Sequence, residues 1–218
     1  MKKLLIYGVK LQAQQLCYYV EREQCAEVAA FVVDPGYRTV HTLNGHPVIT
    51  FDEALREHPP GEYEFTVSFA YQHMIHDRRE KLEKCRQVGY RLFTFISRDA
   101  LVYTDAVGEG TIIYPGCNIA YGVTIGEGNF FETGVTVAHH TRIGNYNFFA
   151  PRSVICGDVT IGEHNFFGAN CTVINSQAIG REVLVAAGAV LSGAKDGCVY
   201  YAPRAVSSPD PSIKIKIK

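Results

Sequence analysis

An apolar residue returns at every sixth position through the second half of the sequence. A six-residue period fits neither the 3.6-residue spacing of a helix nor the simple alternation of a strand. It predicts a chain that turns a corner every six residues, with each short strand pointing one large side chain inward. The series comprises Leu101, Val107, Ile113, Ile119, Ile125, Phe131, Val137, Ile143, Phe149, Ile155, Ile161, Phe167, Val173, Ile179, Val185 and Leu191.

The pattern also recurs at eighteen residues, as expected if three strands close one turn of a triangular coil. One column pairs an apolar residue with glycine, as in Ile125-Gly126, and a second column stacks Phe131, Phe149 and Phe167. Glycine is expected where the chain must turn without interference from a Cβ atom. Stacked coils pair their backbone groups at about 4.8 Å. We therefore expect an all-β parallel β-helix.

The first third of the chain has a different pattern, in which short apolar runs alternate with segments of helical spacing. Strand, helix and strand within one short stretch form a βαβ unit. We expect a small Rossmann-like parallel sheet whose ligands bind beyond the carboxyl ends of the strands. The expected strands are Lys3–Tyr7, Glu27–Val33, Phe65–Ala70 and Tyr90–Ile96, and the expected helices are Leu11–Glu23 and about 75–88. The predicted division is 1–98 for this α/β domain, 99–197 for the β-helix and 198–218 for a C-terminal tail.

The turn after the first strand occupies the place of a phosphate-binding loop, but Gly8 is its only glycine. It is either a plain βα turn or a nucleotide site in which Lys10 meets a phosphate as a point charge, with Gln12 beside it. Asp34, which ends the second strand, is either a turn residue or the acid that binds a ribose.

Composition excludes several classes of partner. The chain carries 21 Lys and Arg against 22 Asp and Glu, so no net field recruits nucleic acid or a membrane. No apolar stretch is long enough to span a bilayer, and we expect a cytoplasmic protein. The seven cysteines are scattered singly without a CxxC pair, which is typical of reduced packing residues and predicts no metal site.

The repeat resembles that of the hexapeptide-repeat acyltransferases, whose fold is a left-handed parallel β-helix. With a βαβ domain in front, the chain resembles the bacterial sugar acetyltransferases that include sialic acid O-acetyltransferases and nucleotide-amino-sugar N-acetyltransferases. The stretch from Ala70 to Met74 is similar to their loop near the sugar nucleotide, which adds Tyr71 to the expected binding residues. The resemblance implies a homotrimer that uses acetyl-CoA as co-substrate and binds a nucleotide-linked sugar.

Acyl transfer from a thioester needs a base for the attacking group and donors for the oxyanion. His139 and His140 lie at a corner after one strand of the repeat. By itself a corner histidine is typical of a solvated turn, whereas the resemblance implies that His139 is the base and His140 its catalytic neighbour. Gly157 lies eighteen residues further on, as a corner glycine or as the oxyanion donor through its N–H. Ala138 stands where many relatives have Glu, and Glu132 is the best substitute by position for orienting the imidazole.

The resemblance also implies an acyl-CoA groove along the later coils. Ala169, Ala187 and Gly188 would admit the pantetheine arm, and Arg204 would meet the phosphates of CoA. Without the resemblance these are small residues at narrow corners and a surface arginine.

The expected reaction is transfer of an acetyl group to an amine of a nucleotide-linked amino-deoxysugar. O-acetylation of a sialic acid or another sugar hydroxyl is the alternative. A zinc enzyme of the carbonic-anhydrase type needs three converging imidazoles, two of them a few residues apart. Position 144, five residues after His139, is Gly, which disfavours this class of enzyme. A non-catalytic sugar-binding β-helix would leave the His139-His140 pair without a role.

Overall fold

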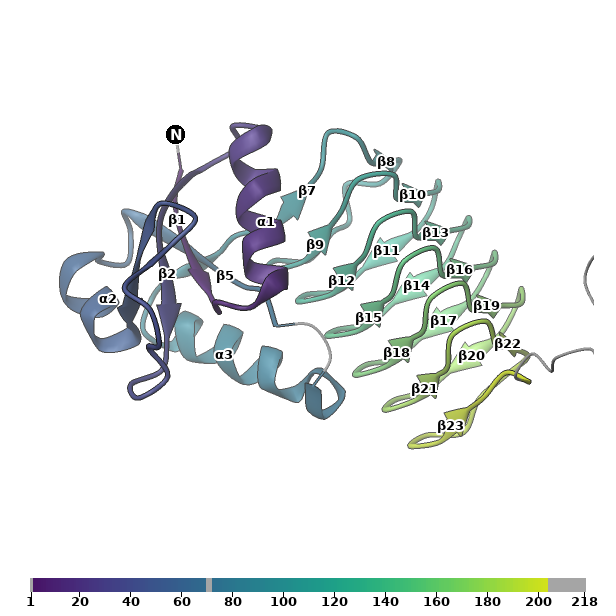
Figure 1. Cartoon of the computed structure of the whole chain (residues 1–218). Helices are drawn as coiled ribbons and strands as arrows, with labels where there is room; N and C mark the ends of the chain where they lie inside the picture. The colour runs from purple at the N-terminus through teal and green to yellow at the C-terminus, as the bar shows by residue number, and fades with distance from the viewer. Residues whose placement is uncertain (1, 70–71, 204–218) are drawn as a thin grey trace, which may run out of the picture.

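The computed structural model describes residues 2–69 and 72–203, which form an α/β unit beside a rod of stacked coils (Figure 1). Tyr71 and Arg204 lie outside the described residues, as does the tail from 204 to 218. The predictions made for these residues therefore stay predictions. No helix among the described residues is long and apolar enough to cross a membrane.

The α/β unit contains a sheet in the order β3-β4-β2-β1-β5-β6. Its strands pair in parallel except for the β3–β4 hairpin, which turns at Asn44-Gly45. The strands are Lys3–Tyr7 (β1), Glu27–Val33 (β2), Thr42–Leu43 (β3), His46–Thr50 (β4), Tyr63–Val67 (β5) and Arg91–Leu92 (β6). The helices are Leu11–Arg22 (α1), Phe51–Glu57 (α2) and His76–Gln87 (α3), and the 3-10 turn Gln72–Ile75 (η1) precedes α3.

The first βαβ unit lies where the sequence predicts it, within one residue at each end. The hairpin β3–β4 and the helix α2 were not predicted, although Thr50 and Glu53 form a capping box at the start of α2. The strand expected over 90–96 is divided, since β6 completes the α/β sheet whereas Phe95–Ile96 (β7) joins a sheet of the coil. The chain therefore enters the coil before the predicted boundary at 98.

The coil has three parallel faces among the described residues, with six, four and seven strands. The six-stranded face holds Leu101–Val102 (β8), Asn118–Ile119 (β10), Thr136–Val137 (β13), Val154–Ile155 (β16), Thr172–Val173 (β19) and Val190–Leu191 (β22). The four-stranded face holds Thr124–Ile125 (β11), Arg142–Ile143 (β14), Thr160–Ile161 (β17) and Ala178–Ile179 (β20). The seven-stranded face holds β7, Ile112–Ile113 (β9), Phe130–Phe131 (β12), Phe148–Phe149 (β15), Phe166–Phe167 (β18), Leu184–Val185 (β21) and Val199–Tyr200 (β23).

These stacked parallel strands fit the β-helix expected from the repeat. Each strand from β9 to β19 pairs with the strand eighteen residues later, whereas β21 pairs with β23 fifteen residues later. The rings of Phe131 and Phe149 stack at 4.5 Å between centroids. Leu101 was expected inside, but Val102 pairs with Ile119 and Leu101 is 55% exposed. The first coil is one residue shorter, which shifts the register. At the other end β23 continues the coil, where a tail had been expected from residue 198.

The corners of the coil are stabilised by buried polar side chains. Asn147 Nδ2 donates to Asn129 Oδ1 at 3.1 Å and to the Gly162 carbonyl at 2.9 Å, and Asn165 repeats this one coil further on. Buried amides that satisfy one another and the backbone cost little, because no donor or acceptor is stranded. The residue before each of these buried polar corner residues takes a left-handed conformation. Examples are His164 before Asn165 and His140 before the buried Thr141, both with φ of 58°.

The α/β unit packs against the seven-stranded face. The outward residues of that face, Ile112, Phe130 and Phe148, share one buried cluster with the α/β core. This explains the Phe-Phe pairs, because the first ring faces the α/β unit and the second faces the coil interior. Arg78 of α3 is fully buried and donates to the carbonyls of Gly110 at 2.7 Å and Gly128 at 3.0 Å.

Candidate active site

The histidine pair lies at the exposed corner between β13 and β14. His140 has φ of 58°, and its Nδ1 lies 3.2 Å from Nδ1 of His139. The ring of His140 also meets Tyr121 of the preceding coil edge-on, at 5.7 Å between centroids and 84°. Two imidazoles are thus held in mutual hydrogen-bonding contact on the coil surface.

Gly157 stacks over His139 as the eighteen-residue period predicts. A Cβ atom on Gly157 would lie 2.7 Å from Cε1 and 2.8 Å from Nε2 of His139, closer than any real side chain permits. Only glycine therefore lets the imidazole lie flat against the next coil. The Gly157 N–H has no hydrogen-bond partner among the described residues, although the same is true of other amides at this corner position.

Glu132 does not orient His139 within one chain, which corrects that prediction. It follows β12 of the seven-stranded face, whereas His139 follows β13 of the six-stranded face, so the two residues occupy different corners. Burial raises the pKa of the Glu132 carboxyl, and the backbone N–H of Thr133 offsets part of that effect. The partner of His139 in the described structure is His140.

A cavity of about 870 Å³ opens in the α/β unit beyond the carboxyl ends of β1, β2 and β5. Of the residues expected to bind the nucleotide, it brings together Gly8, Lys10, Gln12 and Asp34. β1 pairs with β2 on one side and with β5 on the other, so the order of the strands changes direction at β1. This is the crevice in which open parallel sheets bind ligands.

Asp34 is held by groups that the sequence did not reveal. Its carboxylate accepts hydrogen bonds from the Tyr7 hydroxyl at 2.6 Å and Lys84 Nζ at 3.2 Å, and pairs with Lys81 Nζ at 3.1 Å. Burial by itself would raise the pKa of Asp34, but the Tyr7 and lysine contacts outweigh burial and lower it. Burial and the bond to Asp34 raise the pKa of Tyr7. Asp34 is thus an ionised acceptor at the rim of the cavity.

The residues expected to line a CoA groove lie on the last coils. Gly188 N–H donates to the Ala169 carbonyl at 2.9 Å, which stacks the two corners. Ala187 and Gly188 are exposed, whereas Ala169 is half-buried near the α/β unit. The structure places these small side chains on one edge of the rod.

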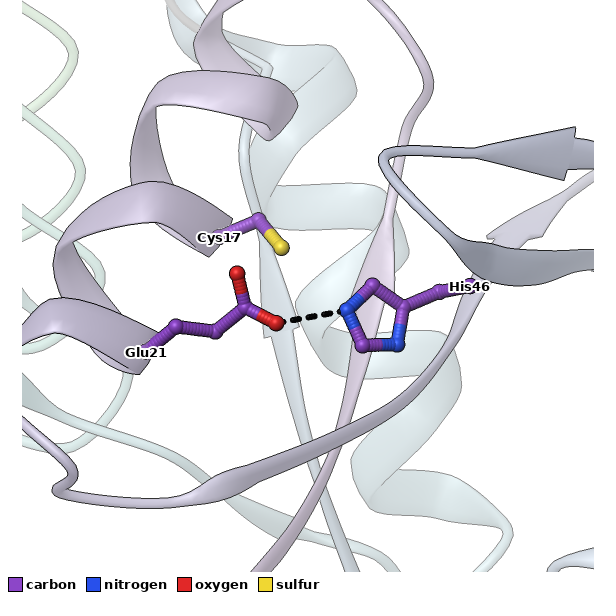
Figure 2. Close-up of side chains that lie close together, drawn as sticks. All are labelled: Cys17, Glu21 and His46. Atoms are coloured by element: carbon purple, nitrogen blue, oxygen red, sulfur yellow. Dashed lines mark hydrogen bonds and ion pairs between the residues drawn. The ribbon is translucent and has the colours of Figure 1, made fainter.

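One group of potential metal ligands among the described residues was not expected from the scattered cysteines. Cys17 and Glu21 come from α1 and His46 from β4, with one ligand atom of each within 4.8 Å of the others (Figure 2). His46 Nε2 already lies 2.6 Å from Glu21 Oε1. Burial, followed by the charge of Glu21, raises the pKa of the Cys17 thiol to about 12, which opposes the thiolate that metals bind. The arrangement is a hydrogen-bonded contact between His46 and Glu21 that ties the β3–β4 hairpin to α1, beside a protonated thiol.

Residues 140–175 match the family described as "Bacterial transferase hexapeptide (six repeats)". The sequence of these coils is similar to bacterial transferase hexapeptide repeats. No curated protein sequence matches the chain significantly.

The fold is similar to three solved structures of acetyltransferases. The acetyltransferase domain of PglB from Neisseria gonorrhoeae FA1090 in complex with acetyl coenzyme A has a TM-score of 0.79 at 22% identity, covering 91% of this chain and 95% of that one. PerB from Caulobacter crescentus in complex with CoA and GDP-perosamine has a TM-score of 0.79 at 27% identity, covering 91% and 93%. A histidine-to-asparagine variant of perosamine N-acetyltransferase from the same bacterium has 0.78 at 28%, also covering 91% and 93%. The resemblance to hexapeptide-repeat sugar acetyltransferases that the sequence indicated is confirmed.

Proposed function

We propose that the chain transfers the acetyl group of acetyl-CoA to an amine of a nucleotide-linked amino-deoxysugar. The observation that carries the proposal is the likeness, over 91% of this chain, to a perosamine N-acetyltransferase in complex with CoA and GDP-perosamine. This chain has both parts that the reaction requires. The histidine corner offers a base for acyl transfer, and the cavity of the α/β unit offers a site for the nucleotide of the acceptor.

His139 is the proposed general base. Nε2 accepts a proton from the acceptor amine as its nitrogen attacks the thioester carbonyl. The Gly157 N–H, which has no partner among the described residues, donates to the oxyanion of the tetrahedral intermediate. Collapse of the intermediate breaks the carbon–sulfur bond, and the imidazolium returns its proton to the leaving thiolate. The products are the acetamido sugar and CoA thiol.

The α/β unit is the proposed Rossmann-like site for the nucleotide of the acceptor. Lys10 is exposed beside the cavity and suits a diphosphate, and Asp34 is an ionised acceptor suited to ribose hydroxyls. Gly8 and Gln12 line the same cavity, and Tyr71 is retained from the sequence. A free sugar has no need for such a unit, so a nucleotide-linked acceptor is favoured over a sialic acid.

A homotrimer is the proposed assembly, with CoA lying along Ala169, Ala187, Gly188 and Arg204. In one chain the α/β unit covers the seven-stranded face, whereas the His139 corner joins the other two faces. Among the described residues, every one that lines the cavity precedes residue 82, so no described coil residue of the same chain reaches it. Bringing the base to the acceptor therefore calls for a second copy. Acetyl-CoA and nucleotide sugars are cytoplasmic metabolites, and we place the reaction there.

The test is a thiol-release assay with acetyl-CoA and a panel of amino-sugar nucleotides and sialic acids. Thiol release with an amino-sugar nucleotide, together with an N-acetylated product by mass spectrometry, supports the proposal. Release with a sialic acid only would replace it by O-acetylation, and no release with any acceptor would leave a binding module. Light scattering of the same sample tests the trimer, and a stable active monomer would exclude a shared site.

A further inference from the structure

We infer that His140 is a positioning residue that holds His139 in the one tautomer able to act as a base, an inference that rests on the proposed acetyl transfer. The Nδ1 atoms of the two rings lie 3.2 Å apart. Two neutral imidazoles can make this contact only if one Nδ1 carries a proton and the other accepts the hydrogen bond. The contact therefore selects a complementary pair of tautomers.

The contact itself indicates which nitrogen of His139 can act. Its Nδ1 faces His140, whereas its Nε2 has no hydrogen-bond partner among the described residues and is the nitrogen left to accept a proton. A base acting through Nε2 must carry its ring proton on Nδ1. His140 then accepts through its own Nδ1 and keeps its proton on Nε2.

The preceding coil holds His140 in place for this task. Its backbone N–H donates to the Tyr121 carbonyl at 3.2 Å, and its ring packs edge-on against the Tyr121 ring. A Cβ atom on Gly122 would lie 3.2 Å from Cδ2 of His140, so the glycine leaves room for the imidazole. The preceding coil thus helps to fix the orientation of the His140 ring that faces His139.

The group that faces Nδ1 of His139 is an imidazole and not a carboxylate. Among the described residues no carboxylate bonds to either ring, since Glu132 lies at another corner and the Asp158 carboxylate accepts from Ser176 Oγ at 3.3 Å. When His139 takes the amine proton, its Nδ1–H still donates to neutral His140. A proton on the Nδ1 of His140 would occupy the accepting nitrogen, so His139 would either lose the contact or carry its own proton on Nε2, and Nε2 could then not act as the base.

Nitrogen-15 NMR of the full chain labelled at histidine tests the tautomer without any substrate. At a pH where both rings are neutral, we expect His139 protonated on Nδ1 in the wild type and in His140→Asp. In His140→Gly we expect a mixture of tautomers. Aspartate accepts without donating and tolerates the left-handed corner, and glycine removes the ring without backbone strain. An unchanged His139 tautomer in His140→Gly would overturn the inference.

Kinetics provide the second readout. His140→Gly is expected to lower kcat about 10²-fold with little change in the KM for acetyl-CoA, and His140→Asp to stay within about tenfold of the wild type. Ser176→Gly, at the same left-handed corner two coils on, is the control for folding and should retain full activity.

The outcomes separate this inference from the proposed function. An active His139→Ala would remove the base itself. An inactive His139→Ala together with a fully active His140→Gly would leave the proposed function standing and overturn the role of His140.

Discussion

His140 and His164 occupy equivalent left-handed corners of the coil, both with φ of 58°, but His140 is exposed and His164 is only 3% exposed. The ring of His164 stacks on His76 of α3 at 4.0 Å and on Tyr146 at 5.5 Å. Its Nδ1 lies 3.2 Å from the carbonyl of Met74. Within the described part of the chain, the ring of His140 contacts His139 of its own coil and Tyr121 of the preceding one.

The difference follows from what covers each edge of the rod. The edge that carries Tyr146 and His164 is packed under η1 and α3, where Arg86 bonds Glu127 at 2.6 Å. The edge that carries His139 is left open. The same backbone thus yields an anchoring edge and a candidate catalytic edge, and the four substitutions that follow test that division.

His139→Ala should have the largest effect. It removes the proposed base, so kcat/KM for the acceptor should fall by about 10³-fold, which corresponds to about 4 kcal/mol of transition-state stabilisation. Because the side chain is exposed, the melting temperature should stay within a few degrees. The thiol-release assay and circular dichroism measure the two quantities. Retained activity would show that the open edge is not catalytic.

Arg78→Met should destabilise the covered edge by about 2–4 kcal/mol in the free energy of unfolding. It leaves the carbonyls of Gly110 and Gly128 without their donor in a buried site. Burial lowers the pKa of Arg78 to about 9, so the charge is already disfavoured there. Arg79→Met is the control, because Arg79 pairs with Glu83 on a partly exposed surface and such pairs contribute at most about 1 kcal/mol. Equal losses in the two variants, by urea unfolding, would contradict this account.

Gly157→Ala should affect chemistry more than stability. The added Cβ overlaps the His139 ring and displaces it, and we expect a loss of about 10–100-fold in kcat, or about 1.4–2.8 kcal/mol. Asn175→Ala changes the same corner position one coil further on, away from that ring, and should retain activity. If the two variants behave alike, Gly157 is only a turn residue.

His164→Phe should remove a small pH dependence of stability. Burial and the charge of His76 lower the pKa of His164 in the folded chain, so the unfolded chain binds its proton more tightly. The contribution of neutral His164 to the free energy of unfolding is therefore complete above the ordinary histidine pKa of about 6.5. It falls at lower pH, by at most about 1.4 kcal/mol per pH unit. Urea unfolding of the wild type and of His164→Phe measures this pH dependence. The two pH values, about 7.5 and 5.5, lie about one unit above and below the ordinary histidine pKa. An unchanged pH dependence in His164→Phe would assign it to other groups.

Much of the fold was predictable because its determinants are periodic. The inward positions from Val107 onward and the stacking of Gly157 on His139 follow from one number, the eighteen residues of a coil. The β3–β4 hairpin and α2 were missed because they are short and carry no sustained period. The slip at Leu101 arose because the first coil is one residue shorter than the period assumed for it.

The candidate sites were predictable only in part. Gly8 and Asp34 could be placed at strand ends from the sequence, but Tyr7, Lys81 and Lys84 around Asp34 could not. Lys81 and Lys84 lie about 50 residues from Asp34, and only the packing of α3 on the sheet brings them there. The contact between His139 and His140 is hidden for a different reason. Adjacent residues usually point apart, and the left-handed corner at His140 turns the two rings together.

The sequence by itself determined the coil, its register beyond the first turn, the βαβ start of the α/β unit and the corner that carries the histidine pair. Each of these depends on local period and on strand ends, which the order of residues encodes directly. The tertiary structure alone decided which edge of the coil is covered, which partner His139 has, and which lysines hold Asp34. The covered edge and the lysines at Asp34 depend on how one packed unit docks on another, and the docking surface is assembled from residues far apart in the chain. The partner of His139 depends on the left-handed corner at His140, which the order of residues does not reveal.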